Sequence, residues 1–168
     1  VIINLPPRYL KSIMTSVAFP AFVLGHDPTR RIVTISYGNE LSSKHASDFR
    51  SIVMSERYQS AFPKMRPVRT LEDEVTTTLR GFRKSTSIGG ALTGLGGNLF
   101  IIDDPIKPED VYSQNRREAV NNWFGGTLLS RLNNKQENQI VVVMQRVLLD
   151  DPTGYLLRDT QCWTELPL

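Results

Sequence analysis

Short apolar runs alternate with amphipathic segments along the chain. Ile2–Leu5, Leu99–Ile102 and Gln139–Met144 are almost entirely apolar, which is typical of strands that are buried on both faces of a sheet. Arg31–Tyr37 adds a strand of alternating, β-branched type. Because helical patterns separate these strands, the sequence predicts an α/β fold with three layers, in which helices cover both faces of a largely parallel central sheet.

The first predicted helix runs from Lys11 to about Leu24. Gly25 and Pro28 follow it and are expected to end it. Four residues at helical spacing are expected to share one face of this helix: Ile13, Ser16, Val17 and Phe22.

Turn and cap residues place the remaining elements. A hairpin is predicted for Glu74–Leu79 and Phe82–Ser87, on either side of Arg80 and Gly81. Further helices are predicted for Asn39–Met54, Pro108–Trp123 with the proline in the first turn, Thr127–Leu132, and Asp151–Arg158 with the aspartate as N-cap.

Length and composition point to one globular domain. The chain has 168 residues and a net charge of +3, which permits contact with nucleic acid without requiring it. The sequence contains neither a secretory signal nor an apolar run of membrane-spanning length. Its single cysteine, Cys162, excludes an internal disulfide, favours a reducing cytoplasm and is predicted to be a core residue. Since the chain starts inside a strand and stops without a tail, residues 1–168 are expected to be one domain cut from a longer protein.

The first candidate site follows the strand Ile2–Leu5. A phosphate-binding loop needs inward-facing amides, a lysine for the outer phosphates and a hydroxyl for magnesium, and Lys11 and Ser12 have the last two roles. Leu10 stands where glycine is usual, so it must accept a strained backbone or a different loop path. Alone the motif is weak, because Lys-Ser pairs also begin ordinary solvated helices. The predicted phosphate-contacting residues are Pro7, Arg8, Tyr9, Leu10, Lys11 and Ser12.

Two further candidate sites follow the later apolar strands. Asp103 is predicted to hold magnesium, and Asp104 to orient and activate the attacking water as the catalytic base. Gln145 is placed to bond a phosphate oxygen or that water, and Arg146 to couple nucleotide state to movement. Ordinary polar strand ends would show the same residues, so these assignments depend on their combination with Lys11.

The order of these motifs resembles that of bacteriophage terminase large subunits, nearly from end to end. The resemblance includes the glycine-poor, proline-rich loop before Lys11, the pair Asp103 and Asp104, and the segment from Gln145 to Gly154. It implies a P-loop ATPase domain that uses ATP and Mg²⁺. It also implies that Arg8 approaches the γ-phosphate. The glycine-rich segment Ile88–Asn98 is followed by a strand and not by a helix, so it is no dinucleotide fingerprint and is predicted to be a mobile loop beside the nucleotide site.

The resemblance further implies a motor that drives double-stranded DNA into a capsid in the bacterial cytoplasm. Its implied partners are a portal protein, a terminase small subunit and further copies of itself in a ring, with no membrane. The adenine-binding segment and the nuclease domain of the family have no counterpart in this sequence, so DNA cleavage is not expected of it. A helicase-type ATPase core and a degenerate, non-hydrolysing assembly module are the alternatives.

Overall fold

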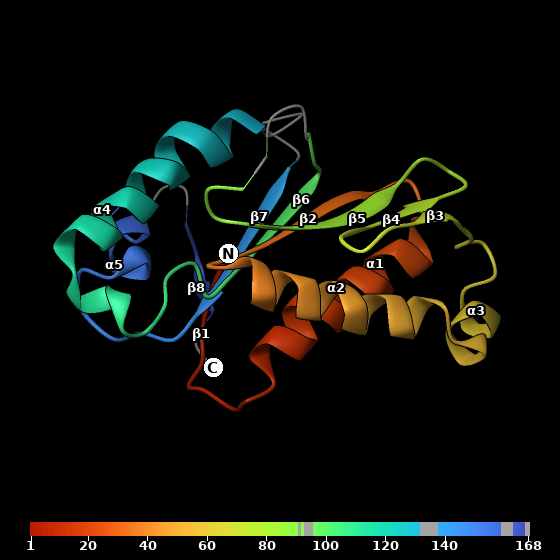
Figure 1. Cartoon of the computed structure of the whole chain (residues 1–168), viewed down its shortest axis with the longest axis horizontal. Coiled ribbons are helices and arrows are strands. Elements are labelled where there is room, and N and C mark those ends of the chain that lie inside the picture. Colours follow the sequence, from red (N-terminus) through yellow and green to blue (C-terminus); the bar gives the residue numbers. More distant parts are fainter. Residues whose placement is uncertain (91, 93–95, 132–137, 159–162, 167–168) are drawn as a thin grey trace.

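The computed structural model describes residues 1–90, 92, 96–131, 138–158 and 163–166 (Figure 1). A single eight-stranded sheet in the order β3-β4-β5-β2-β6-β7-β1-β8 runs through the molecule. The strands are β1 (Ile2–Asn4), β2 (Arg31–Ser36), β3 (Pro67–Thr70), β4 (Glu74–Thr77), β5 (Phe82–Ser87), β6 (Leu99–Asp103), β7 (Gln139–Met144) and β8 (Glu165–Leu166).

The sheet is parallel from β5 to β8, and only the β3–β4 and β4–β5 pairings are antiparallel. β7 lies between β1 and β6. Its register aligns Met144 with Asn4 and Val143 with Asp103. The carboxyl ends of β1, β7 and β6 therefore meet at one edge of the sheet, which is where open parallel sheets carry their ligand sites.

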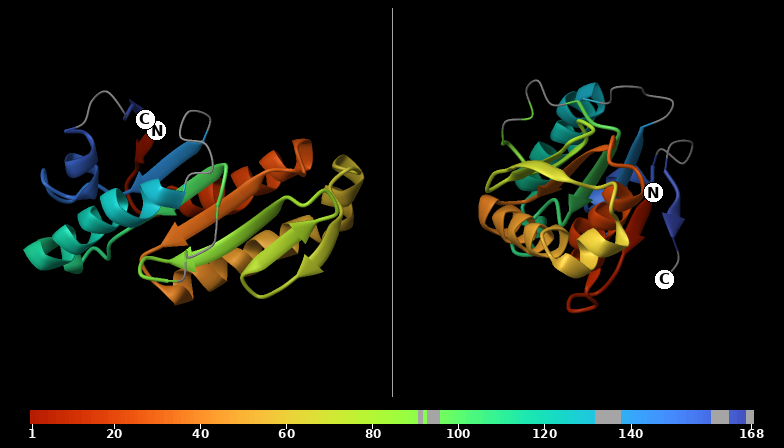
Figure 2. Two further views of the ribbon diagram at one scale, coloured as in Figure 1. Left: turned by 90° about the horizontal axis from the view of Figure 1, so that it is seen from above. Right: turned by 90° about the vertical axis from the view of Figure 1, so that its right-hand side faces the viewer.

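Helices cover both faces of the sheet (Figures 1 and 2). One face carries the π-helix Ile13–Ala18, α1 (Phe19–His26), α2 (Asn39–Val53) and α3 (Glu56–Ala61). The other carries the 3₁₀ turn Asp110–Tyr112, α4 (Gln114–Trp123), the π-helix Phe124–Leu128, the 3₁₀ turn Leu129–Arg131 and α5 (Pro152–Leu156). None of the helices in the described residues is long and apolar enough to cross a membrane.

The alternation of side chains along β6 divides the core into two parts. Leu99 and Ile101 join the cluster beneath α1 and α2, whereas Phe100 and Ile102 join the cluster beneath α4 and α5. All five residues of β6 are buried. The three-layer, largely parallel α/β architecture predicted from the apolar runs is therefore confirmed.

The first helix differs from its prediction in phase and in length. Ser16 and Val17 are buried as expected, but Ile13 and Phe22 are 38% and 57% exposed. The π-helical segment has a wider turn than an α-helix, so residues before and after it no longer share one face. Gly25 lies inside α1 rather than ending it, because the ring of Phe62 packs where a Cβ would stand.

The helices after β6 also needed correction. The segment at Pro108 forms only a 3₁₀ turn, and α4 begins at Gln114 because Ser113 adopts an extended N-cap conformation. The separate helix predicted for Thr127–Leu132 is instead a direct continuation of α4, first as a π-helix and then as a 3₁₀ turn that ends at Arg131.

The hairpin β4–β5 and the N-cap role of Asp151 are confirmed. α5 is shorter than predicted and ends at Leu156, while α3, β3 and β8 were not predicted at all. Cys162, and residues 91 and 93–95 of the glycine-rich segment Ile88–Asn98, lie outside the described residues.

Candidate functional site

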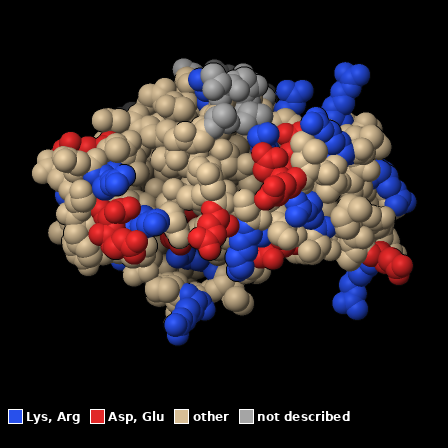
Figure 3. Space-filling model, viewed as in Figure 1, with Lys and Arg blue, Asp and Glu red and all other residues tan. Residues whose placement is uncertain are grey.

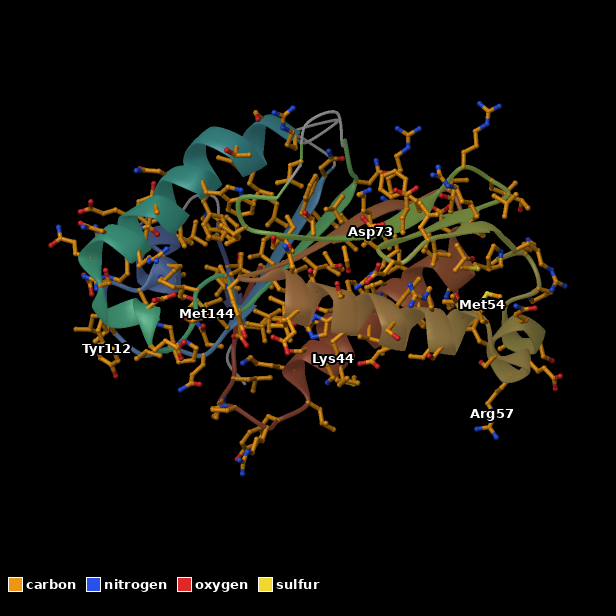
Figure 4. All side chains as sticks on the ribbon, in the orientation of Figure 1. Lys44, Met54, Arg57, Asp73, Tyr112 and Met144 are labelled. Atoms are coloured by element: carbon orange, nitrogen blue, oxygen red, sulfur yellow. The ribbon has the colours of Figure 1, made fainter. Side chains whose placement is uncertain are left out.

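The edge where β1, β7 and β6 end brings the candidate residues of two distant motifs together. Lys11 and Ser12 begin the helix that follows β1, and Asp103 and Asp104 stand at the end of β6. Met144, labelled in Figure 4, ends the intervening strand β7. The Nζ atom of Lys11 lies 2.8 Å from Oδ2 of Asp104, and the Ser12 hydroxyl donates to Oδ1 of Asp103 at 3.1 Å.

Asp103 is completely buried. Its Oδ1 accepts the bond from Ser12, and its Oδ2 accepts a 2.8 Å bond from the hydroxyl of Ser16. Burial, together with the neighbouring charge of Asp104, raises the pKa of Asp103 to about 6, although the two serine bonds and Lys11 act against this. Hydrogen bonds therefore orient both carboxylate oxygens, but they do not fully compensate for the burial of the charge, so the pKa of Asp103 stays above its usual value.

Asp104 is held by its backbone as well as by Lys11. Its N–H donates to the carbonyl of Val143, and its carbonyl accepts from the N–H of Tyr37. Its φ of 46° places it in the left-handed region, where a non-glycine residue is strained. Bonds to both sides of the strand end therefore fix an unusual backbone that aims the side chain at Lys11.

The loop between β1 and Lys11 also adopts left-handed backbone. Arg8 has a φ of 68° and Leu10 a φ of 57°. Leu10 therefore accepts the strained conformation that the missing glycine would have adopted freely, which was one of the two paths predicted for it. The residues of this loop from Pro6 to Leu10 are all exposed.

Gln145 and Arg146 flank the same loop from the end of β7. Together with Pro7 they line a hollow of about 290 Å³, whose other residues are Asn4, Leu5 and Pro6. The guanidinium of Arg146 is not free in this hollow, because its Nε donates to Asp151 at 3.1 Å. Arg146 thus ties down the turn that leads into α5.

Asp151 is the centre of that turn. It is fully buried and accepts bonds from the backbone N–H groups of Gly154 and Val147 as well as from Arg146. A Cβ at Gly154 would stand 1.8 Å from the carbonyl oxygen of Leu149, so the turn packs against the helix start without room for a side chain. The loop after β7 is therefore closely packed beside the candidate site.

Sequence reasoning missed two buried polar side chains next to Asp103. Ser16 lies four residues after Ser12, a spacing that places both side chains on one side of a helix. This spacing could have indicated that Ser16 also contacts Asp103. His45, on α2, is 2% exposed, and its Nδ1 lies 3.7 Å from Oδ2 of Asp103. Burial lowers the pKa of His45 to about 4, with the charges of Arg83 and Lys44 adding to the effect, so the ring is neutral near pH 7.

Two solved structures share the fold of this chain. The chain matches the HK97 bacteriophage large terminase with a TM-score of 0.61 and 14% identity, over 95% of this chain and 32% of that one. It matches the N-terminal domain of the DNA packaging ATPase from bacteriophage phi29 with a TM-score of 0.56 and 13% identity, over 94% of this chain and 77% of that one.

No protein-family model matches the sequence, and no curated protein sequence matches it significantly. At 13–14% identity the structural likeness establishes the fold. It agrees with the predicted P-loop architecture and with the resemblance carried by the motifs. The chain spans about a third of the length of the HK97 terminase.

Replacing Asp103 with Asn is expected to stabilise the domain at neutral pH. The folded-state pKa is raised from 3.8 to about 6, so ionisation costs nothing below pH 3.8, costs progressively more between these values, and costs most above pH 6. Asp103→Asn should therefore raise the free energy of unfolding by about 1–3 kcal/mol at pH 7.5 and by little near pH 4. Urea unfolding at both pH values, without magnesium, measures this. The control is the substitution Asp150→Asn at an exposed position. Equal stability of the wild type and Asp103→Asn at pH 7.5 would contradict the raised pKa of Asp103 in the folded state.

Asp151 and Asp150 form a matched pair for testing the turn after β7. Asp151→Ala leaves Nε of Arg146 and the backbone N–H groups of Val147 and Gly154 without their acceptor, and should lower the free energy of unfolding by about 2–4 kcal/mol. Asp150→Ala removes an exposed pair with Arg117 and should cost about 0.5 kcal/mol or less. Denaturant unfolding of both variants gives the comparison. Similar losses in the two would mean that Asp151 does not organise the turn.

Proposed function

We propose that this chain is the ATP-hydrolysing motor domain of a phage-type terminase that packages double-stranded DNA. The observation that carries the proposal is the meeting of Lys11 and Ser12 with Asp103 and Asp104 at one sheet edge, within hydrogen-bonding distance. These are a cation, a hydroxyl and two carboxylates, the groups that phosphoryl transfer from a magnesium nucleotide requires. The fold shared with the two phage proteins supports the same conclusion.

Lys11 is proposed to neutralise the β- and γ-phosphates. Its ammonium now pairs with Asp104, so phosphates entering the loop compete with that carboxylate for one cation. Transfer of Lys11 to the phosphates frees Asp104 to accept a proton from the attacking water and to orient it. The exchange of partners links nucleotide binding to the activation of the base.

Ser12 and Asp103 are proposed to hold Mg²⁺. A carboxylate and a hydroxyl offer the hard oxygen ligands that this ion prefers, and Ser16 keeps the second carboxylate oxygen in place. Burial raises the pKa of Asp103, and a cation bound beside it would lower this pKa again by favouring the ionised carboxylate. When bound, the metal would neutralise charge on the phosphates during transfer.

The loop and the end of β7 are proposed to supply the remaining contacts. Pro7, Arg8, Tyr9 and Leu10 form the loop wall, and the side chain of Arg8 is exposed and available to the γ-phosphate. Gln145 lines the adjoining hollow, where it can bond a phosphate oxygen or the water. Because Arg146 is anchored to Asp151, a coupling role for it involves the whole turn after β7 moving as a unit.

The partners follow from the proposed motor role: double-stranded DNA, a portal protein, a terminase small subunit and further copies in a ring, in the bacterial cytoplasm. We propose that residues 1–168 are the ATPase domain alone and that any nuclease activity belongs to another part of the protein. The face in Figure 3 carries basic and acidic side chains interspersed, so charge there does not single out the DNA-contacting residues. A helicase core would instead unwind duplexes, whereas a terminase would depend on portal and capsid.

Lys11→Ala is expected to abolish ATP turnover in the full-length protein. Removing the cation that balances the phosphate charge should cost orders of magnitude, about 10³-fold or more, in kcat/KM. Phosphate release with Mg²⁺ and ATP measures the loss, with the exposed Lys64→Ala as the matched control. Turnover at the wild-type rate in Lys11→Ala would refute the assignment.

Asp104→Asn is expected to separate binding from hydrolysis. Asparagine tolerates the left-handed backbone at this position, so the local fold is kept while the base is lost. Calorimetric titration should show that ATP with Mg²⁺ still binds, while phosphate release falls about 10²-fold or more. A wild-type protein that binds ATP but releases no phosphate would instead identify the non-hydrolysing assembly module.

A further inference from the structure

A fully buried arginine lies behind the candidate site. Arg83, on β5, is 1% exposed, and its guanidinium lies 5.0 Å from the centroid of the Phe49 ring. Burial lowers the pKa of Arg83 to about 9, and Arg50 adds to the effect. A charge in such a place is costly and is tolerated where it makes specific polar contacts.

The polar contact that Arg83 makes leads directly towards Asp103. Its Nη2 donates to the backbone carbonyl of Ser16 at 3.1 Å. The hydroxyl of the same serine donates to Oδ2 of Asp103, while Ser12 donates to Oδ1. Two hydrogen bonds through Ser16 therefore connect Arg83 on β5 to Asp103, one of the proposed metal ligands.

Ser16 belongs to the π-helical segment Ile13–Ala18, which follows the phosphate loop directly. π-helical turns are rare in proteins, and those that occur often lie at functional sites. Their wider turn changes which residues face inward. Ser12 precedes this segment and Ser16 lies within it, four residues later, and their hydroxyls donate to the two oxygens of one carboxylate. In a regular α-helix the Ser16 carbonyl would accept from residue 20, but this residue is Pro20, which has no N–H. The Nη2 bond of Arg83 therefore reaches a carbonyl that lacks its α-helical donor.

We propose that Arg83 is a positioning residue for the metal site. By holding the Ser16 carbonyl it fixes the π-helical turn after the phosphate loop, and so keeps Ser12 and Ser16 on the two oxygens of Asp103. The part that concerns magnesium rests on the proposed function, whereas the part that concerns the turn does not.

Neighbouring groups do not replace this contact. Among the described residues the Nδ1 atom of His45 has no hydrogen-bond partner and lies 3.7 Å from Oδ2 of Asp103, so Ser16 is the group that holds this oxygen. The Nε atom of Arg83 likewise has no partner within the part of the chain that the structure describes. The guanidinium therefore acts on the site through the Ser16 carbonyl.

The test compares Arg83→Met and Arg83→Lys with the exposed control Arg69→Met. Methionine keeps the volume beside Phe49, and replacing a buried charge by an apolar side chain often preserves the fold. The first readout needs no ligand: hydrogen exchange of the amides of residues 13–18 should become about 10-fold faster or more in Arg83→Met. Arg83→Lys, which keeps one donor, should be intermediate, and Arg69→Met should match the wild type.

The second readout is the Mg²⁺ concentration needed for ATP binding, followed by calorimetry. It should rise about 10-fold or more in Arg83→Met, as for other residues that orient a metal ligand, while binding in EDTA stays at the wild-type level. A residue that served packing alone would change both conditions equally.

Wild-type exchange of residues 13–18 in folded Arg83→Met would overturn the inference, and so would an unchanged Mg²⁺ requirement in that variant. Should Arg83→Met fail to fold, Arg83→Lys is judged by the same criteria. If the wild-type protein binds no nucleotide, the proposed function fails, and the exchange data alone then decide whether Arg83 fixes the turn.

Discussion

The carboxylate of Asp103 is completely buried, and neighbouring hydroxyl and ammonium groups partly offset the cost of removing its charge from water. An ionised carboxylate can remain in the interior only where donors or cations compensate for its lost hydration. Here Ser12 and Ser16 each satisfy one oxygen, and Lys11 stands close by on Asp104. The compensation is incomplete, since the pKa of Asp103 remains raised, which supports the metal-ligand role that we propose for this residue.

The architecture was predictable where one residue pattern had one physical solution. Apolar runs can be satisfied only between two covering layers, so the buried strands were identified correctly. α3, β3 and β8 were missed because they are short or largely exposed, and they owe their form to neighbours that the local sequence does not reveal. The π-helix at Ile13–Ala18 was missed although the sequence carries a local signal for an irregular turn. Pro20 lacks the N–H that a regular α-helix would direct to the Ser16 carbonyl.

The candidate-site residues that directly follow strands were predictable from the sequence, whereas the buried residues that contact them from other elements were not. Lys11, Ser12, Asp103 and Asp104 follow strands directly, so parallel topology alone was enough to expect them at one edge. Arg83 gave no such signal, because an arginine in a strand is usually solvated and nothing in the local sequence marks this one as buried. Arg146 shows the opposite case: its position beside the site was foreseen, but its bond to Asp151, five residues later, was not.

The left-handed backbone at Arg8 and Leu10 has an evolutionary consequence. At both positions the backbone is one that glycine adopts without strain, and here it carries bulky side chains instead. Glycine-rich and glycine-poor versions of such a loop can therefore interconvert one residue at a time, while the surrounding fold stays the same. A search pattern that requires glycine at these two positions would miss this chain, although its backbone there is one that glycine favours.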